Sequence, residues 1–313
     1  MNVIYDLDEE ITPDERAVAL GFFDGVHLGH KAVLNKAVKY KEKYLPCAFT
    51  FVMDKDFRPE KKKNSLAVQT EEEKFNCMEN LGIKEAFCPD FSSFMSLSPE
   101  EFAEGILIKK FNAKVISCGR DFRFGKKARG DINFLKSICE KHNIILEIAE
   151  PVLYKDEIIS STAIRQAISE GNMNKATNML GRYYSIKAPV IHGKQLGRTI
   201  GFPTINQRIP ENHTIPKFGV YAAIITIPDG RKYAGAVNVG VKPTVGSDEV
   251  LAETYICDFH EDLYGKTVKT EFVEFLRGEQ KFESLEELSN AIKRDSEKSK
   301  EIFIGISENE RKN

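Results

Sequence analysis

Residues 21–30 read Gly21-Phe-Phe-Asp-Gly-Val-His-Leu-Gly-His30, and this stretch decides the fold of the first half of the chain. An apolar run, residues 17–23, overlaps its start, and apolar residues at helical spacing follow it over residues 33–44. A second apolar run comes at residues 46–52. The pattern therefore predicts a strand, a helix and a parallel strand, with the quoted stretch at the first turn.

The turn from strand to helix has the composition of an anion site. A helix start offers unpaired N–H groups and a positive dipole end, and Gly25 and Gly29 permit close approach of the backbone. His27 and His30 would point at the same anion and donate hydrogen bonds to an α-phosphate during in-line displacement. This arrangement indicates nucleotidyl transfer; the alternative is two structural histidines beside a tight turn.

The rest of the first half repeats the alternation of strands and helices. A capping box at Thr70 and Glu73 predicts a helix that stops at Gly82, and a second start signal at Ser98 predicts a helix through Phe111. Strands are expected at residues 114–118 and 144–148, and a helix at 162–169. We therefore expect an α/β domain with a Rossmann-like, mostly parallel sheet over residues 1–180.

Beyond Gly181 the pattern changes to closely spaced strands punctuated by turn residues. Such spacing favours an antiparallel barrel or sandwich, and we expect a β-barrel domain over residues 181–313. A terminal helix is expected to pack on it. The strands are predicted at residues 221–227, 233–239, 254–259 and 267–275, and the helix at 284–303.

Size and composition agree with a globular protein of two domains. The 313 residues exceed the size of a single core, and 42% are hydrophobic. The 45 Lys and Arg against 47 Asp and Glu give a net charge of -2, which disfavours nucleic-acid and membrane partners. The six scattered cysteines favour reduced core thiols over a metal site. With no spanning segment and a polar start, we expect a cytoplasmic protein.

The stretch at residues 21–30 resembles the HxGH nucleotidylyltransferases, and in full it resembles the adenylyltransferase half of the bifunctional riboflavin kinase/FAD synthetases. Gly119-Arg-Asp-Phe-Arg-Phe-Gly125 and Ile159-Ser-Ser-Thr-Ala-Ile-Arg165 are similar to two further motifs of that family. The resemblance implies catalytic residues His27 and His30, flavin contacts Asp121 and Phe122, and ATP contacts Gly21, Phe22, Asp24, Gly25, Gly29, Ser160, Ser161, Thr162 and Arg165.

One stretch departs from the family pattern. Where the family has Thr-Phe-x-Pro-His-Pro, this chain continues from Thr50 into Met53-Asp54-Lys55, so a histidine that would help to hold phosphate is replaced. This difference leaves open a protein whose adenylyltransferase is weakened and which acts as a riboflavin kinase only. The nearby Lys61, Lys62 and Lys63 are interpreted as a solvated loop.

A second site opens the C-terminal domain. Gly193, Gly197 and Gly201 suit a loop that covers phosphates with backbone amides, although such glycines also make ordinary turns. Thr204 and Asn206 lie two residues apart on an extended segment, so both face one side and could bind Mg²⁺.

The stretch Gly201-Phe-Pro-Thr-Ile-Asn206 resembles the PTAN signature of riboflavin kinases, with Ile205 where Ala is usual. Further stretches of that family follow at residues 218–222, 237–244, 253–259, 262–265 and 275–277. By this resemblance Glu253 is the catalytic base that takes the proton of the ribityl hydroxyl, and Arg277 borders the flavin.

The sequence thus predicts a bifunctional enzyme that uses ATP and Mg²⁺ to convert riboflavin to FMN and FMN to FAD. It is expected to be a monomer or weak homo-oligomer with small-molecule partners. A flavin carrier without turnover is the alternative from another class, and a nucleic-acid binder, suggested by the basic residues 120–129, is disfavoured by the overall charge.

Overall fold

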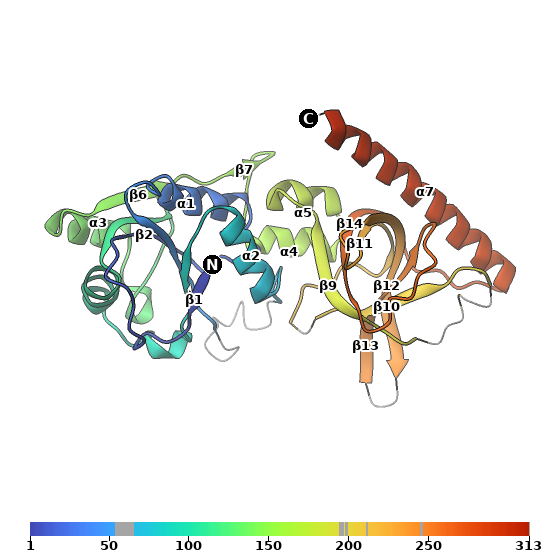
Figure 1. The fold of residues 1–313 in the computed structure, drawn as a ribbon, viewed down its shortest axis with the longest axis horizontal. Helices are drawn as coiled ribbons and strands as arrows, with labels where there is room; N and C mark the ends of the chain where they lie inside the picture. The colour runs from blue at the N-terminus through green and yellow to red at the C-terminus, as the bar shows by residue number, and fades with distance from the viewer. Residues whose placement is uncertain (54–65, 194–196, 198–199, 211, 245–246, 313) are drawn as a thin grey trace. The chain divides into compact units, whose positions relative to one another are not determined.

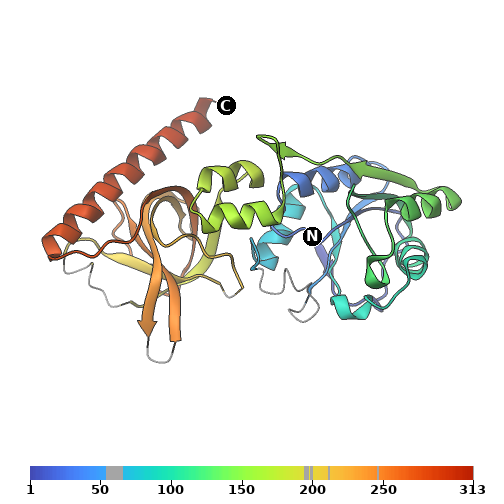
Figure 2. The same cartoon turned by 180° about the vertical axis from the view of Figure 1, so that it is seen from behind.

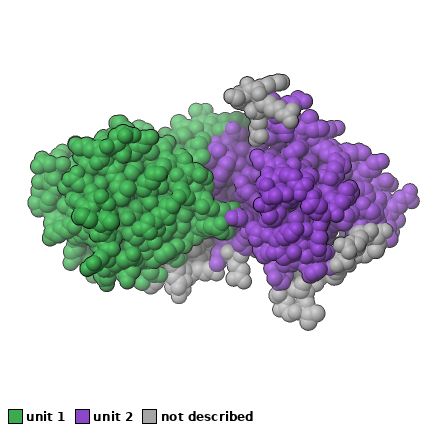
Figure 3. Space-filling view, viewed as in Figure 1, with its two compact units in different colours: residues 1–65, 70–161 green, residues 66–69, 162–313 purple. Residues whose placement is uncertain are grey.

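The computed structural model of the chain describes residues 1–53, 66–193, 197, 200–210, 212–244 and 247–312 (Figure 1). It divides into two compact units, coloured separately in Figure 3. The first contains Met1–Ser65 and Thr70–Ser161, and the second contains Leu66–Gln69 and Thr162–Asn313. The predicted boundary at residues 180 and 181, taken as the limit of two folding domains, stays a prediction.

The first unit is built on a six-stranded parallel sheet, as the sequence predicts. Every residue of Arg16–Leu20 is buried, as expected for a strand covered on both faces. Val18 and Leu20 belong to one apolar cluster, and Ala17 and Ala19 belong to another on the opposite face. In spatial order the strands are β1 (Asn2–Ile4), β4 (Glu85–Phe87), β3 (Leu45–Phe49), β2 (Arg16–Leu20), β5 (Ala113–Gly119) and β6 (Ile145–Ala149).

Three α-helices of the first unit begin at residues whose side chains cap them. The capping box of Thr70 and Glu73 is confirmed, with both of its hydrogen bonds present at the start of α2 (Glu71–Asn80). The helix predicted from Ser98 is a π-helix, η4 (Glu101–Lys110). The sequence analysis missed α3 (Ile132–Lys141), which Asp131 caps. The first α-helix, α1 (Leu28–Val38), begins directly after its N-cap His27. Short 3₁₀ helices lie at η3 (Phe91–Ser93) and η5 (Lys126–Ala128).

A short hairpin and two helices connect the sheet to the barrel. The hairpin pairs β7 (Leu153–Tyr154) with β8 (Glu157–Ile158), and α4 (Ser161–Ser169) follows. The second helix, α5 (Met173–Leu180), was not predicted from the sequence. Gly181 ends α5 in the left-handed conformation, with φ 66°.

The second unit is a closed barrel of six strands in antiparallel pairs, so the barrel alternative is confirmed and the sandwich is not observed (Figures 1 and 2). Pairing of the first two strands closes it. The strands are β9 (Tyr184–Ile191), β10 (Thr204–Arg208), β11 (Gly219–Thr226), β12 (Lys232–Thr244), β13 (Ser247–Ile256) and β14 (Thr267–Arg277). The terminal helix α7 (Leu285–Lys312) packs on β11 and β12 and extends past the predicted end at residue 303.

Four residues from the middle of the first half belong to the second unit. The Ala67 N–H donates to the Asn212 carbonyl at 2.5 Å, and the Thr214 N–H donates to the Ala67 carbonyl at 2.7 Å. Arg182 donates to the Gln69 side chain at 2.5 Å. The segment Leu66–Gln69, which we call the strap, therefore packs in the second unit although the residues on both sides of it in the sequence belong to the first.

The cysteines are free thiols, and all but Cys77 are buried. Burial raises the pKa of the Cys88, Cys139 and Cys257 thiols to about 11, so these groups are protonated at neutral pH. Over the described part of the chain, no group of three or more His, Cys, Asp or Glu side chains could hold a metal ion. None of the helices in that part has the length and apolar composition to cross a membrane.

Candidate active sites

His27 and His30 lie together where the carboxyl end of β2 leads into α1. His27 is the N-cap of α1, and its Nδ1 accepts a hydrogen bond from the His30 N–H at 3.2 Å. The two imidazole rings stack, with centroids 3.6 Å apart. Because Nδ1 of His27 accepts, the proton of the neutral ring lies on Nε2, which is then a donor.

His30 is held as a neutral imidazole. Burial of the ring, and next the neighbouring His27, lower the pKa of His30 well below its usual value. The ring packs edge-on to Phe23, with centroids 5.4 Å apart. Its Nδ1 is buried without a hydrogen-bond partner among the described residues. His30 therefore presents an uncharged polar group beside His27 at the end of the sheet.

Two of the predicted glycines, Gly21 and Gly29, leave space for the rings of the histidine pair and of Phe23. A Cβ on Gly21 would lie 2.8 Å from the Phe23 ring, which itself packs on His30. A Cβ on Gly29 would lie 3.2 Å from the His27 ring. Neither neighbour can move without disturbing the stacked imidazoles, so the space is needed for packing of the site as well as for ligand approach.

The start of α4 reaches the same loop. Ser161 donates from Oγ to the Asp24 carbonyl at 2.8 Å, so the structure brings these two predicted ATP contacts together. Thr162 and Arg165 belong to the second unit, where the Arg165 guanidinium donates to the Thr162 hydroxyl at 3.3 Å. Ser160 precedes the first residue of the helix.

The predicted flavin contacts lie in the turn after β5. The Phe122 N–H donates to the Gly119 carbonyl at 3.1 Å, and a Cβ on Gly119 would approach the Asp121 carboxylate to 3.1 Å. Asp121 is exposed, and the Phe122 ring stacks on Phe124 with centroids 5.6 Å apart.

The sequence analysis missed an aromatic row at the end of β3. Phe22 contacts Phe51 with centroids 5.1 Å apart, and Phe51 contacts Phe91 at 5.4 Å. Phe22 is 42% exposed, although its ring packs on Phe51. The signal available in the sequence was the count of 21 phenylalanines without any tryptophan. Asp54 and Lys55, which carry the departure from the family pattern, lie outside the described residues, as do Lys61, Lys62 and Lys63.

In the barrel, strand register places the second group of predicted residues side by side. Asn206 on β10 is the direct cross-strand partner of Glu253 on β13. The Thr204 hydroxyl donates to Glu253 Oε1 at 3.1 Å. Asn238 on β12 is the partner of Glu253 on its other side, and it was not among the predicted site residues. Cross-strand partners share a face of the sheet, so the three strands bring two amides and a carboxylate together.

Asn206 is buried against Gly193. Its side chain is 4% exposed, and a Cβ on Gly193 would lie 2.4 Å from its Nδ2. Asn206 Oδ1 is buried and has no hydrogen-bond partner among the described residues. Gly201 has φ 81°, and a Cβ on Gly197 would lie 2.2 Å from the Phe202 carbonyl oxygen, so both positions exclude other residues. Lys194, Gln195, Leu196, Arg198 and Thr199 are not described.

A cavity of about 450 Å³ opens beside Thr204. Several of its walls lie in the family stretches at residues 253–259 and 262–265, but they were not predicted to line a cavity. Tyr264, one of these walls, stacks on His192 with ring centroids 3.9 Å apart. The lining residues are Val190, Pro203, Thr204, Ile205, Ile256, Phe259, His260, Glu261, Asp262, Leu263 and Tyr264.

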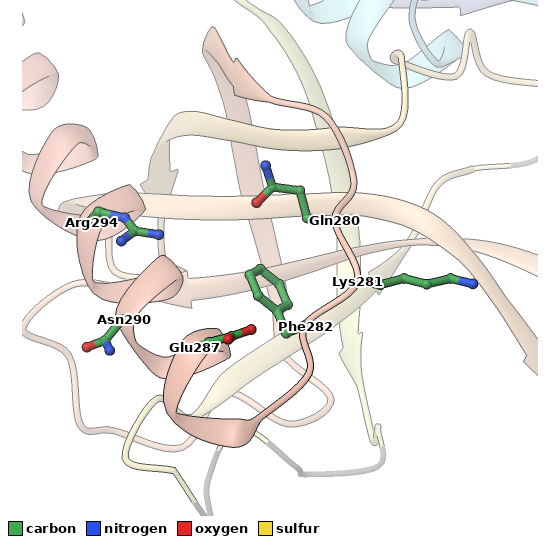
Figure 4. Close-up of a pocket in the computed structure, with 6 residues that line it drawn as sticks. All are labelled: Gln280, Lys281, Phe282, Glu287, Asn290 and Arg294. Atoms are coloured by element: carbon green, nitrogen blue, oxygen red, sulfur yellow. The ribbon is translucent and has the colours of Figure 1, made fainter.

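Arg277 forms an ion pair with Asp295 near a second cavity. Its Nη2 lies 2.7 Å from Asp295 Oδ2, its Nε lies 3.1 Å from the same oxygen, and Asp295 is 9% exposed. The guanidinium also lies 5.6 Å from the centroid of the Phe282 ring. Phe282 lines a cavity of about 440 Å³ between the loop after β14 and α7 (Figure 4). The other lining residues are Gln280, Lys281, Glu287, Asn290 and Arg294.

Comparison with known proteins agrees with this geometry. A family model described as FAD synthetase matches residues 9–163, and one described as riboflavin kinase matches residues 180–303. A solved structure described as a macrolide-efflux protein from Streptococcus pneumoniae aligns with a TM-score of 0.86 and 32% identity, covering 95% of this chain and 98% of the other.

Curated relatives match over nearly their full length. The bifunctional riboflavin kinase/FMN adenylyltransferase of Listeria monocytogenes is 35% identical over 98% of this chain and 99% of its own. The protein of the same description from Bacillus subtilis is 34% identical over 92% of this chain and 93% of its own. Since both family models match along one polypeptide and a bifunctional relative matches over nearly its full length, the chain belongs to the family of bifunctional riboflavin kinase/FMN adenylyltransferases.

Proposed function

We propose that the chain carries out two successive steps of flavin cofactor synthesis. In residues 181–313, riboflavin and ATP give FMN and ADP; in residues 1–180, FMN and ATP give FAD and pyrophosphate. The observation that carries the proposal is the pairing of Asn206 with Glu253, together with the Thr204 hydroxyl on the same carboxylate. The stacked histidines at the start of α1 support the second reaction.

In the kinase reaction Glu253 is proposed to take the proton of the attacking hydroxyl. Phosphoryl transfer needs mainly positioning and neutralisation of charge, so a carboxylate base suffices. The unpartnered oxygen of Asn206 and the hydroxyl of Thr204 are hard ligands that fit Mg²⁺ bound to ATP. When bound, the ion would withdraw charge from the transferred phosphoryl group.

The two cavities of the second unit are proposed to take the two substrates. The cavity of about 450 Å³ shares Thr204 with the metal site and has apolar and aromatic walls, which suit the nucleoside of ATP. The cavity of about 440 Å³ lies beside Arg277, which suits the flavin. The Arg277 guanidinium already pairs with Asp295 and packs near the Phe282 ring. We therefore expect Arg277 to border the flavin indirectly, by fixing the loop that carries Phe282.

In the adenylyl-transfer reaction the histidines act as hydrogen-bond donors. His27 Nε2 carries a proton and would donate to the α-phosphate of ATP, and the neutral His30 adds a second polar group without repelling a metal ion. Gly25 and Gly29 leave room for the triphosphate, and Ser160 is proposed to bind the leaving pyrophosphate. The roles that the resemblance assigns to Thr162 and Arg165 stay predictions. Phe22 and Phe122 offer aromatic faces on which the isoalloxazine of FMN could stack.

The intact chain, incubated with riboflavin and MgATP, tests the proposal by chromatography of its products over time. FMN should appear first and FAD after it, with ADP and pyrophosphate released in the respective steps. FMN that accumulates without FAD would identify a riboflavin kinase only. Bound riboflavin without ADP release would identify a flavin carrier, and turnover unaffected by chelation of divalent ions would contradict the metal site.

We further propose that the protein works in the cytoplasm as a monomer or weak homo-oligomer. The six free cysteines, five of them buried, suit a reducing compartment. Sedimentation of the intact chain with and without flavin would test the oligomeric state.

A further inference from the structure

The loop that carries the histidines is strained and needs external support. Phe23 has φ 55° and Val26 has φ 34°, and residues with a Cβ avoid this region. The two carbonyl groups on either side of Phe23 each accept a hydrogen bond from a hydroxyl outside the loop. Thr50 donates to the Phe22 carbonyl at 2.9 Å, and Ser161 donates to the Asp24 carbonyl at 2.8 Å. These two hydroxyls therefore stabilise the unfavourable backbone conformation at Phe23.

Lys74 donates a hydrogen bond to one of these hydroxyls, that of Thr50. It lies on α2, is 8% exposed, and places its Nζ 3.4 Å from Thr50 Oγ1. A lysine ammonium can only donate, so Thr50 Oγ1 accepts from Lys74 and must give its own proton to the Phe22 carbonyl. The hydrogen bonds thus run in one direction, from the ammonium through the hydroxyl to the loop.

The charge of Lys74 is buried at a cost. Its Nζ lies 5.2 Å from the centroid of the Phe75 ring and 6.0 Å from that of Phe22, so aromatic faces give part of its stabilisation. Within the described residues, no ion pair joins Lys74 to a carboxylate. A buried cation without such a partner is unfavourable compared with an apolar residue of the same shape. We therefore expect the positive charge of Lys74 to have a function that an apolar residue could not provide.

We propose that Lys74 is a positioning residue for FMN adenylylation, which fixes the histidine loop through Thr50. By polarising the Thr50 hydroxyl, the ammonium strengthens the bond to the Phe22 carbonyl and makes the following Phe23 N–H a stronger donor. Its field also favours an anion at this end of the sheet. The inference rests on the proposed adenylyl-transfer function of the first unit.

The test uses the full-length chain with Lys74→Met, Lys74→Arg, Thr50→Val and the Lys74→Met/Thr50→Val double variant. Lys39→Met is the matched control, because Lys39 also pairs with an aromatic ring but is exposed. Formation of FAD from FMN gives kcat and KM separately. Phosphorylation of riboflavin by the same preparations reports whether the rest of the chain is intact.

Lys74→Met should lower kcat/KM for FAD formation about tenfold to a hundredfold, mostly through kcat, since misplacement of a reacting group is costly. Arginine should restore most of the activity, and the control should stay within about twofold, as surface substitutions do. If Lys74 acts through Thr50, the double variant should be no worse than about twofold below the poorer single variant. FAD formation unchanged in Lys74→Met, or effects that multiply in the double variant, would overturn the proposal.

A structural readout separates this proposal from the function on which it rests. Amide hydrogen exchange of a peptide covering residues 20–30 should be faster in Lys74→Met and Thr50→Val than in the unaltered chain. Absence of FAD formation by the unaltered chain would count against the proposed function alone. Unchanged exchange of this peptide in both variants would count against Lys74 as a positioning residue.

Discussion

The histidine loop and the barrel site differ in what fixes their geometry. In the loop, strained residues such as Phe23 are held by hydrogen bonds from Thr50 and Ser161, which lie elsewhere in the chain. In the barrel, Asn206 and Glu253 face each other because the register of β10 and β13 leaves no alternative. The first site should therefore be sensitive to substitutions at distant supporting residues, whereas the second should be sensitive mainly to the chemistry of its own side chains.

The largest effect is expected from Glu253→Gln. Glutamine keeps an oxygen that can accept the Thr204 hydrogen bond, so the geometry is retained while the base is lost. Riboflavin-dependent ADP formation should fall by about 10²–10⁴-fold, the usual contribution of a general base. FAD formation from added FMN should be unaffected in the same preparation. Kinase turnover close to that of the unaltered chain would show that Glu253 is only a strand residue.

His27→Asn is the corresponding change in the loop. Asparagine is a favourable N-cap and can accept the His30 N–H, but it lacks the Nε2 donor. The rate of FAD formation should fall by about 10²–10³-fold, the cost of removing one donor to a developing charge. Riboflavin phosphorylation serves as the internal control. If FAD formation survives while α1 keeps its cap, the donor role of His27 is wrong.

A smaller effect is expected where steric packing alone is changed. In Gly193→Ala the new Cβ would meet Asn206 Nδ2 at 2.4 Å and displace the amide from its strand partner. Overpacking of this kind costs about 1–3 kcal/mol, which corresponds to about a tenfold to hundredfold loss in kinase kcat/KM. The Mg²⁺ concentration for half-maximal activity should rise as well. Gly305→Ala is the control, because nothing lies within 4 Å of that Cβ.

The sequence predicts local features of this molecule better than pairings between distant segments. The buried strands and the capping box at Thr70 are read from neighbouring residues, and both are present. Short α5 was missed, although Asn172 and Gly181 cap its two ends, because eight residues carry little periodicity. Strand β9, which closes the barrel, was also missed.

The candidate sites show the same limit. The resemblance supplied the histidines and Glu253, but it did not place Asn238 beside Glu253, because that contact depends on the register of β12 and β13. The bond from Lys74 to Thr50 spans 24 residues and joins a helix to a strand end. The strap Leu66–Gln69 is held in part by backbone hydrogen bonds of Ala67, which leave no side-chain pattern in the sequence. Its side-chain bond, from Arg182 to Gln69, joins residues 113 positions apart.

The smallest effect concerns the stability of the loop in acid. Burial lowers the pKa of His30 well below its usual value of 6.5. The unfolded chain therefore binds a proton at His30 near pH 6.5 that the folded chain does not bind. The contribution of the neutral His30 to the free energy of unfolding is intact above that pH and is lost as the pH falls toward the pKa of the folded state. The loss cannot exceed about 1.4 kcal/mol per pH unit. His30→Gln should accordingly show a smaller fall in Tm than the unaltered chain between pH 8 and pH 5.5, measured by calorimetry. An equal fall in both chains would mean that His30 takes up its proton in the folded state, and the neutral imidazole proposed for adenylyl transfer would have to be abandoned.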